Sequence, residues 1–131
     1  MQMVILAGGL ATRLKSLSIE CPKSMLPIEG KPFLEHQVAL LRKNGIRNIV
    51  LCIGHWGEQI EAYFKEGGRL GVHIQYSKEG SRLLGTGGAL KKAAPLLEDA
   101  FFVMYGDSYL MLDYAHIEKE FRKKDSAFRK P

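Results

Sequence analysis

Three short apolar runs, each followed directly by a glycine, constrain the fold of this chain more than any other feature. They span residues 3–7, 49–53 and 101–105, and Gly8, Gly54 and Gly106 follow them. A short run without charged side chains is typical of a strand that is covered on both faces, as in a parallel sheet. The sequence therefore predicts three buried strands whose carboxyl ends deliver their loops to one edge of a sheet.

Helical patterns separate these runs. We expect helices over residues 33–41 after Pro32, 57–64, 89–94 before Pro95, and 114–124. Residues 72–76 alternate between apolar and polar side chains, which predicts a fourth strand with one wetter face. Strand and helix alternate along the chain, so we predict a three-layer αβα fold. Its doubly wound, mainly parallel Rossmann-like sheet would bind ligands beyond the carboxyl ends of the strands.

The length favours a single domain over residues 1–131. Two separately cored domains in 131 residues would each be of marginal size. Because 46% of the residues are hydrophobic and 25% are charged, the composition is that of a globular protein and not of a disordered or fibrous one. We find no internal repeat, linker or low-complexity segment that would mark a domain boundary.

The formal net charge of +5 is compatible with an anionic partner. The charges are dispersed, and acidic residues such as Glu120 and Asp125 interrupt the basic stretch 119–130, so a solvated helix explains that stretch better than a nucleic-acid site. No apolar run reaches the ~18 residues of a membrane span. Two cysteines cannot form a disulfide framework, and Cys52 lies in an apolar run, so we expect reduced thiols and a cytoplasmic protein.

The first motif with chemical content is the loop over residues 6–14, which follows the first apolar run. Gly8 and Gly9 allow backbone N–H groups to approach phosphate oxygens, and Arg13 adds a planar fork of donors that matches a phosphate. The loop is neither a Walker A motif nor a dinucleotide-binding G-x-G-x-x-G. Because two glycines after a strand can also form an ordinary turn, a phosphate-binding function depends on neighbouring motifs.

Two such neighbours are present. Lys23 lies in a loop between Pro22 and Pro27, which restrict the backbone and would hold a second cation near the phosphates. Asp107 follows the third apolar run and Gly106, at the end of a predicted strand, where a carboxylate together with phosphate oxygens suits Mg²⁺. The alternatives are a solvated lysine and an aspartate that caps a turn or helix.

Taken together, these motifs resemble the signature of the sugar-phosphate nucleotidyltransferases, also called NDP-sugar pyrophosphorylases. The Gly-rich loop with its arginine is followed by Pro22-Lys23 and then by Gly30-Lys31-Pro32. The resemblance continues through residues 79–90 and the Gly106-Asp107 pair, and it covers residues 3 to about 113. It is greatest to bacterial enzymes for heptose, mannose or muramate 1-phosphate, and it implies the nucleotide-diphospho-sugar transferase type of the predicted fold.

The resemblance implies that a nucleoside triphosphate (NTP) and a sugar 1-phosphate are converted to an NDP-sugar and pyrophosphate. It implies Arg13 and Lys23 as catalytic cations and Asp107 as a ligand of Mg²⁺. The implied nucleotide-binding residues are Leu6, Ala7, Gly8, Gly9, Thr12, Glu79, Gly85, Thr86 and Gly88. The implied partners are these two small substrates and no nucleic acid or membrane, and a homo-oligomer is compatible with the family.

Family members are longer, and their second half carries the sugar-phosphate contacts and a second metal-binding carboxylate. We therefore expect the N-terminal part of a longer family domain, which binds NTP and transfers the nucleotidyl group only weakly. A non-catalytic nucleotide sensor is the alternative, although it would not need Arg13, Lys23 and Asp107 together. Covalent catalysis has no support, because the sequence contains neither a Ser/His/Asp order nor a G-x-S-x-G elbow. The motifs identify neither the base nor the sugar.

Overall fold

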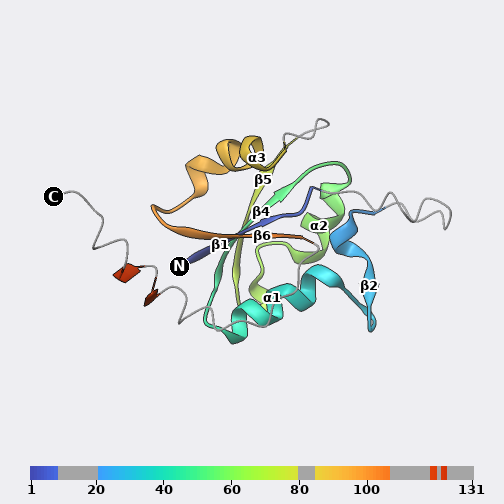
Figure 1. The fold of residues 1–131 in the computed structure, drawn as a ribbon. Coiled ribbons are helices and arrows are strands. Elements are labelled where there is room, and N and C mark those ends of the chain that lie inside the picture. Colours follow the sequence, from blue (N-terminus) through green and yellow to red (C-terminus); the bar gives the residue numbers. More distant parts are fainter. Residues whose placement is uncertain (9–20, 80–84, 107–118, 121, 124–131) are drawn as a thin grey trace.

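The computed structural model describes residues 1–8, 21–79, 85–106, 119–120 and 122–123. Its central feature is a parallel sheet of four strands: β1 (Gln2–Leu6), β4 (Asn48–Ile53), β5 (His73–Lys78) and β6 (Phe101–Tyr105). Their spatial order is β5-β4-β1-β6, and every neighbouring pair is parallel (Figure 1). The predicted doubly wound, Rossmann-like α/β sheet is confirmed.

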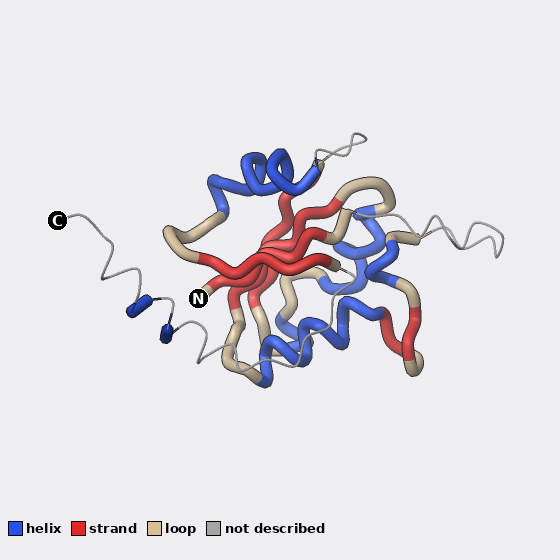
Figure 2. The backbone as a smooth tube through the Cα atoms, in the orientation of Figure 1, coloured by secondary structure: helices blue, strands red, loops and turns tan. Residues whose placement is uncertain are grey.

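Helices cover both faces of this sheet. Helices α1 (Phe33–Lys43) and α2 (Gly57–Phe64) pack on one face, and α3 (Gly85–Ala93) packs on the other (Figure 2). The shorter described elements are η2 (Lys23–Met25), β2 (Pro27–Ile28), β3 (Lys31–Pro32), η3 (Gly68–Leu70) and η4 (Ala94–Leu96). The sequence predicted α2 at its observed bounds, and most of the helix predicted over residues 114–124 lies outside the described residues.

Alternate residues of β1 explain why the sheet is buried on both sides. Met3 and Ile5 point into the larger core, formed with α1 and α2, whereas Val4 points into a smaller core beneath α3. All three side chains are at most 1% exposed. Because successive residues face opposite layers, a strand covered by helices on both faces must be apolar throughout, which is the pattern that the sequence shows.

The order of the strands creates a switch point between β1 and β6. The chain moves from β1 to β4 and β5 on one side, then crosses by α3 to the opposite face and returns beside β1 as β6. In doubly wound sheets, ligands bind in the crevice outside the carboxyl ends of the strands where this reversal occurs. The fold therefore directs attention to the residues that follow β1 and β6.

Local differences from the sequence prediction occur around glycine and proline. α3 begins at Gly85 and not at the predicted residue 89, so the Gly-rich segment forms the first turn of the helix. β5 begins at His73 and extends to Lys78, beyond the predicted 72–76. The Pro-rich segment forms η2 and the small antiparallel hairpin β2–β3, with Glu29 and Gly30 at positive φ in its turn. Local residue propensity does not predict the glycine-rich and proline-rich elements, because tertiary contacts stabilise them.

A buried carboxylate joins the elements below the sheet. Glu35 in α1 accepts a 2.7 Å hydrogen bond from the Tyr63 hydroxyl of α2, and its side chain is 8% exposed. Arg69 of η3 lies 3.3 Å from the same carboxylate oxygen, and Lys31 of β3 lies 3.7 Å from the other. The Tyr63 hydrogen bond is the main reason that the pKa of Glu35 lies below its ordinary value, and the two cations add to this effect.

We expect Glu35→Gln to lower the free energy of unfolding at pH 7 by about 1–2 kcal/mol, because a charged hydrogen-bond acceptor is lost. Because the pKa of Glu35 is lower in the folded state than in the unfolded state, its ionised form stabilises the fold at pH values above the unfolded-state pKa of about 4.5. This stabilisation is lost as the pH falls through the folded-state pKa. Urea unfolding between about pH 7 and pH 3 should therefore show a shallower acid decline in the variant. Glu66→Gln, an exposed match, should behave like the parent chain, and an unchanged acid decline in Glu35→Gln would contradict the assignment.

Candidate functional site

Backbone pairing continues beyond the ends of the central strands and fixes the residues that follow them. The Ala7 N–H donates to the Cys52 carbonyl (2.8 Å), the Gly106 N–H donates to the Leu6 carbonyl (2.9 Å), and the Glu79 N–H donates to the Ile53 carbonyl (2.8 Å). Each bond extends the ladder by one step past β1, β6 or β5. Ala7, Glu79 and Gly106 therefore lie along the carboxyl edge with little backbone freedom.

Two glycines at this edge lie so close to neighbouring atoms that a side chain at either position would contact them. A β-carbon at position 8 would lie 3.2 Å from Oε1 of Glu79, which shows that the Glu79 carboxylate lies against the Gly8 backbone. A β-carbon at position 106 would lie 3.0 Å from the Leu6 carbonyl oxygen and 3.2 Å from the Ala7 Cα. The absence of side chains here lets backbone groups and the Glu79 carboxylate meet at one place.

The Glu79 carboxylate is a local source of negative charge. The residue is 9% exposed and begins the segment that links β5 to α3. Burial, together with the nearby negative charge of Glu79, raises the pKa of Cys52 to about 11. Cys52 is therefore a protonated, inert thiol at neutral pH, as its apolar neighbours predicted, and Glu79 is the ionisable side chain that reaches Gly8.

The first turn of α3 forms another wall of this edge. Gly85, Thr86 and Gly87 are exposed and Gly88 is half-buried, while Ala89 and Ala93 anchor the helix in the smaller core. The Thr86 hydroxyl lies 3.5 Å from the hydroxyl of Tyr105, the last residue of β6. Leu6, Ala7, Gly8, Glu79 and the Gly85–Gly88 turn thus all belong to this carboxyl edge or the helix start beside it. The structure thus brings together these residues of the implied nucleotide-binding set, and their role in binding stays a prediction.

Lys23 reaches the same end of the sheet through a different element. It begins η2, where the Leu26 N–H donates to the Lys23 carbonyl and Met25 packs against the larger core. The side chain of Lys23 is exposed, and η2 lies at the end of the molecule to which the carboxyl end of β1 points (Figure 1). Of the remaining predicted residues, Gly9, Thr12, Arg13 and Asp107 lie outside the described part of the chain.

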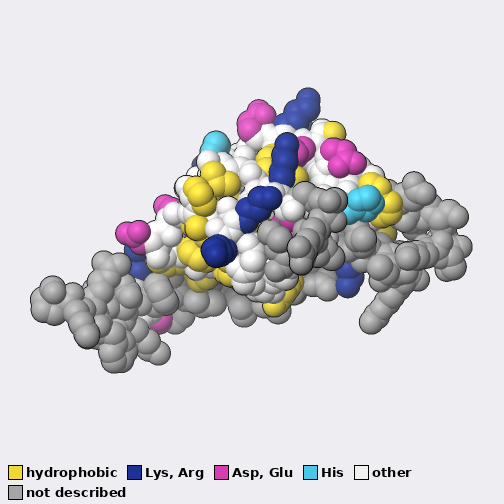
Figure 3. Space-filling model, turned by 90° about the horizontal axis from the view of Figure 1, so that it is seen from above, with side chains coloured by type: hydrophobic (Ala, Val, Ile, Leu, Met, Phe, Trp, Pro, Cys, Tyr) yellow, Lys and Arg dark blue, Asp and Glu magenta, His cyan; other side chains and the backbone are white. Residues whose placement is uncertain are grey.

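No cluster of three His, Cys, Asp or Glu side chains that could hold a metal ion occurs among the described residues. Within that same part of the chain, no helix is long and apolar enough to cross a membrane. On the face seen from the α3 side, lysine and arginine side chains are interspersed with acidic ones (Figure 3). This mixed surface agrees with the dispersed charge of the sequence.

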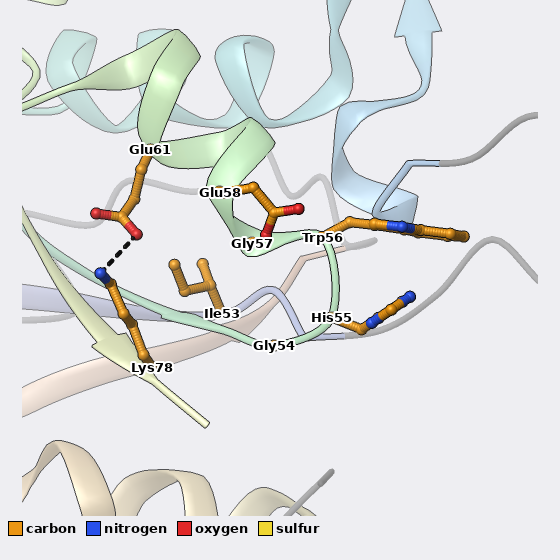
Figure 4. Close-up of a pocket in the computed structure, with 8 residues that line it drawn as sticks. All are labelled: Ile53, Gly54, His55, Trp56, Gly57, Glu58, Glu61 and Lys78. Atoms are coloured by element: carbon orange, nitrogen blue, oxygen red, sulfur yellow. Dashed lines mark ion pairs between the residues drawn. The ribbon is translucent and has the colours of Figure 1, made fainter. Parts of the chain in front are cut away.

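A cavity also follows the carboxyl end of β4, and sequence reasoning did not predict it. The cavity measures about 370 Å³ and is lined by Ile53, Gly54, His55, Trp56, Gly57, Glu58, Glu61 and Lys78. Glu61 and Lys78 form a 3.0 Å ion pair at one side, while His55 and Trp56 extend toward the other (Figure 4). Because this pair neutralises Lys78, the one lysine among the described lining residues, the cavity is a poorer phosphate site than the edge at Gly8.

The fold and the glycines at the strand ends define a doubly wound α/β protein whose ligand crevice lies at the switch point between β1 and β6. The chain matches the family described as nucleotidyl transferase over residues 2–130, and it belongs to this family.

Named relatives support this membership. The chain is 42% identical to D-glycero-alpha-D-manno-heptose 1-phosphate guanylyltransferase of Campylobacter jejuni, over 90% of this chain and 52% of the relative. It is 38% identical to UTP–glucose-1-phosphate uridylyltransferase of a Synechocystis species, over 95% of this chain and 35% of the relative. The crystal structure of HddC from Yersinia pseudotuberculosis complexed with GMP-PN matches with a TM-score of 0.78 and 38% identity, over 95% of this chain and 53% of that one. The chain thus spans about half the length of these relatives, or less.

Proposed function

We propose that this chain provides the nucleotide-binding half of a sugar-1-phosphate nucleotidyltransferase site. The observation that supports this most is the meeting of Gly8, Glu79 and the first turn of α3 at the carboxyl edge, in a chain that matches the family over almost its whole length. In the proposed reaction, an oxygen of a sugar 1-phosphate attacks the α-phosphorus of an NTP. A new P–O bond forms, the bond to the β-phosphate oxygen breaks, and pyrophosphate leaves.

No protein nucleophile takes part in this reaction, because positioning and charge stabilisation provide most of the acceleration in phosphoryl-type transfers. Gly9, which follows Gly8 in the loop, leaves room for the phosphates, and the cations Lys23 and Arg13 balance the charge that develops on the leaving pyrophosphate. Mg²⁺ would supply further charge neutralisation. Asp107 is its proposed ligand, since this residue follows Gly106 directly in the sequence and a carboxylate has the oxygen chemistry that Mg²⁺ prefers.

We further propose guanine as the base, because the carboxylate of Glu79 is an acceptor-only group. Guanine presents two neighbouring donors, N1–H and the N2 amino group, and a carboxylate can accept from both. Uracil presents one donor between two carbonyl oxygens, so the same carboxylate would face two acceptors. A buried polar group left without its partner discriminates strongly between ligands. The guanylyltransferase named among the relatives is consistent with this choice.

The proposed reaction is tested by measuring pyrophosphate release from GTP and UTP with heptose, mannose and glucose 1-phosphates. Release that depends on both GTP and a sugar 1-phosphate is the expected result. Because the expected acceptor contacts lie in a second half, this release should be slow. Tight binding of GTP with no release of pyrophosphate by this chain or by a C-terminally extended one would favour a nucleotide sensor instead. If neither GTP nor UTP bound, the nucleotide site itself would be wrong.

Glu79→Gln should weaken GTP binding by about tenfold to a hundredfold, because the amide offers one acceptor oxygen in place of two. ITP, which lacks the 2-amino group, should bind the parent chain more weakly than GTP and should lose less affinity on this substitution. Isothermal titration calorimetry with GTP, ITP and UTP measures these differences. Equal losses for all three nucleotides would show that Glu79 does not contact the base.

Gly8→Ala should weaken GTP binding by at least about tenfold, because the new methyl group would press on the Glu79 carboxylate and displace it from the base. The backbone at Gly8 is not in the left-handed region, so we expect little change in the thermal midpoint. Gly68→Ala is the matched control, since position 68 lies in η3 and a β-carbon there would make an ordinary 3.6 Å contact with the Glu66 carboxylate. Normal binding by Gly8→Ala would reduce the loop to an ordinary turn.

Lys23→Ala should lower the affinity for GTP by about tenfold or more and leave the affinity for GMP almost unchanged, because the lysine is proposed to contact the outer phosphates. Lys43→Ala, at the end of α1, is the control for loss of an exposed positive charge. Titration of both nucleotides against the three proteins measures the difference. A loss shared equally by GTP and GMP would place Lys23 elsewhere.

A further inference from the structure

Tyr105 is an exposed aromatic residue at the switch point, and none of the motifs above accounts for it. It is the last residue of β6, it pairs with Leu6 of β1, and it is 55% exposed. Its carbonyl oxygen accepts a 3.1 Å hydrogen bond from the side-chain amide of Gln37 in α1, and the next residue, Gly106, is bonded to the Leu6 carbonyl. The backbone at Tyr105 is therefore held by α1 and by the neighbouring strand β1, although the side chain is open to solvent.

The side chain lies on the face of the sheet that α3 covers. Leu6, which pairs with Tyr105, packs with the smaller core under α3, and the Tyr105 hydroxyl lies 3.5 Å from the Thr86 hydroxyl in the first turn of that helix. Both residues are exposed. The pair thus forms a polar wall where the end of β6 meets the start of α3, one strand away from Gly8.

The contact between the two hydroxyls leaves most of their bonding capacity unused. A separation of 3.5 Å is long for O–H···O, which is ordinarily about 2.5–3.0 Å. Each hydroxyl can donate one hydrogen bond and accept two. Two exposed hydroxyls at this spacing therefore present several donor and acceptor positions to one ligand, and they match a ligand that itself carries adjacent hydroxyls.

The spacing of the strands relates this wall to the proposed nucleotide site. Glu79 follows β5, so it approaches Gly8 from the side of β1 that is opposite to β6. A base held by Glu79 over Gly8 would therefore direct its attached sugar toward β6, which lies one strand spacing of about 4.8 Å from β1. The group nearest to Tyr105 and Thr86 would then be the ribose. Its 2′ and 3′ hydroxyls are the adjacent pair that the wall can receive.

We propose that Tyr105 and Thr86 form a hydroxyl pair that binds the ribose diol and selects ribonucleotides over deoxyribonucleotides. This inference rests on the proposed nucleotide function and assigns to Tyr105 a binding role in the same site. A purely structural alternative is that Tyr105 only steadies the first turn of α3. The two roles differ in one measurable respect, because a structural residue would affect ribo- and deoxyribonucleotides equally.

The test uses isothermal titration calorimetry of the full chain with GTP, 2′-deoxyGTP and 3′-deoxyGTP. The parent chain should bind GTP about threefold to tenfold more tightly than at least one of the deoxy analogues, as expected for one hydrogen bond. Tyr105→Phe and Thr86→Val keep the ring and the branched shape, and each should weaken GTP binding while leaving that analogue nearly unchanged. The selectivity ratio should approach one in the double variant.

Tyr63→Phe is the matched control, because it removes a bonded tyrosine hydroxyl on the opposite face of the sheet. It should retain the selectivity of the parent chain. If Tyr105→Phe lowered the affinity for GTP and for both analogues by the same factor, or changed none of these affinities, the proposed ribose contact would be wrong. The proposed nucleotide site would not be contradicted by that result. If the parent chain bound no nucleoside triphosphate, the proposed function and this inference would fail together.

Discussion

Strand β1 is hydrogen-bonded along both edges and covered on both faces, and the rest of the structure is arranged around it. It pairs with β4 on one side and with β6 on the other, while its alternate side chains enter two separate cores. Full burial of each large aliphatic side chain stabilises the fold by about 1.5–3 kcal/mol. A strand held in this way ends at a well-defined point, and that point is where Gly8 begins the candidate site.

The candidate site is rigid at its base because the backbone ladder does not stop with the strands. The hydrogen bonds of Ala7, Glu79 and Gly106 carry the pairing one residue further and bring three connecting segments to one edge. Glycine at positions 8 and 106 is a consequence of this crowding, since a side chain at either would meet a neighbour. The same lack of side chains that permits close packing also gives a ligand access to backbone N–H groups.

The proposed site separates groups of opposite charge along the edge of the sheet. Glu79 is negative and lies against Gly8, whereas Lys23 comes from a different element below the sheet. A nucleotide has the same polarity, with hydrogen-bond donors on a guanine base and negative charge on its phosphates. In the proposed binding mode, the Glu79 carboxylate accepts hydrogen bonds from the base and does not repel the phosphates. The neutral hydroxyls of Tyr105 and Thr86 bind the sugar, which lies between the base and the phosphates of the nucleotide.

The sequence by itself determined the α/β class, the three buried strands, α1, α2 and the grouping of glycines at one edge. These features depend on burial and local periodicity, which short segments such as Ile49–Ile53 carry in their own residues. Only the tertiary structure decided that Glu79 lies against Gly8, that Thr86 meets Tyr105, and that Glu35 joins α1 to α2 and η3. Such contacts join residues far apart in the chain. They follow from strand order and helix packing, which no local pattern encodes.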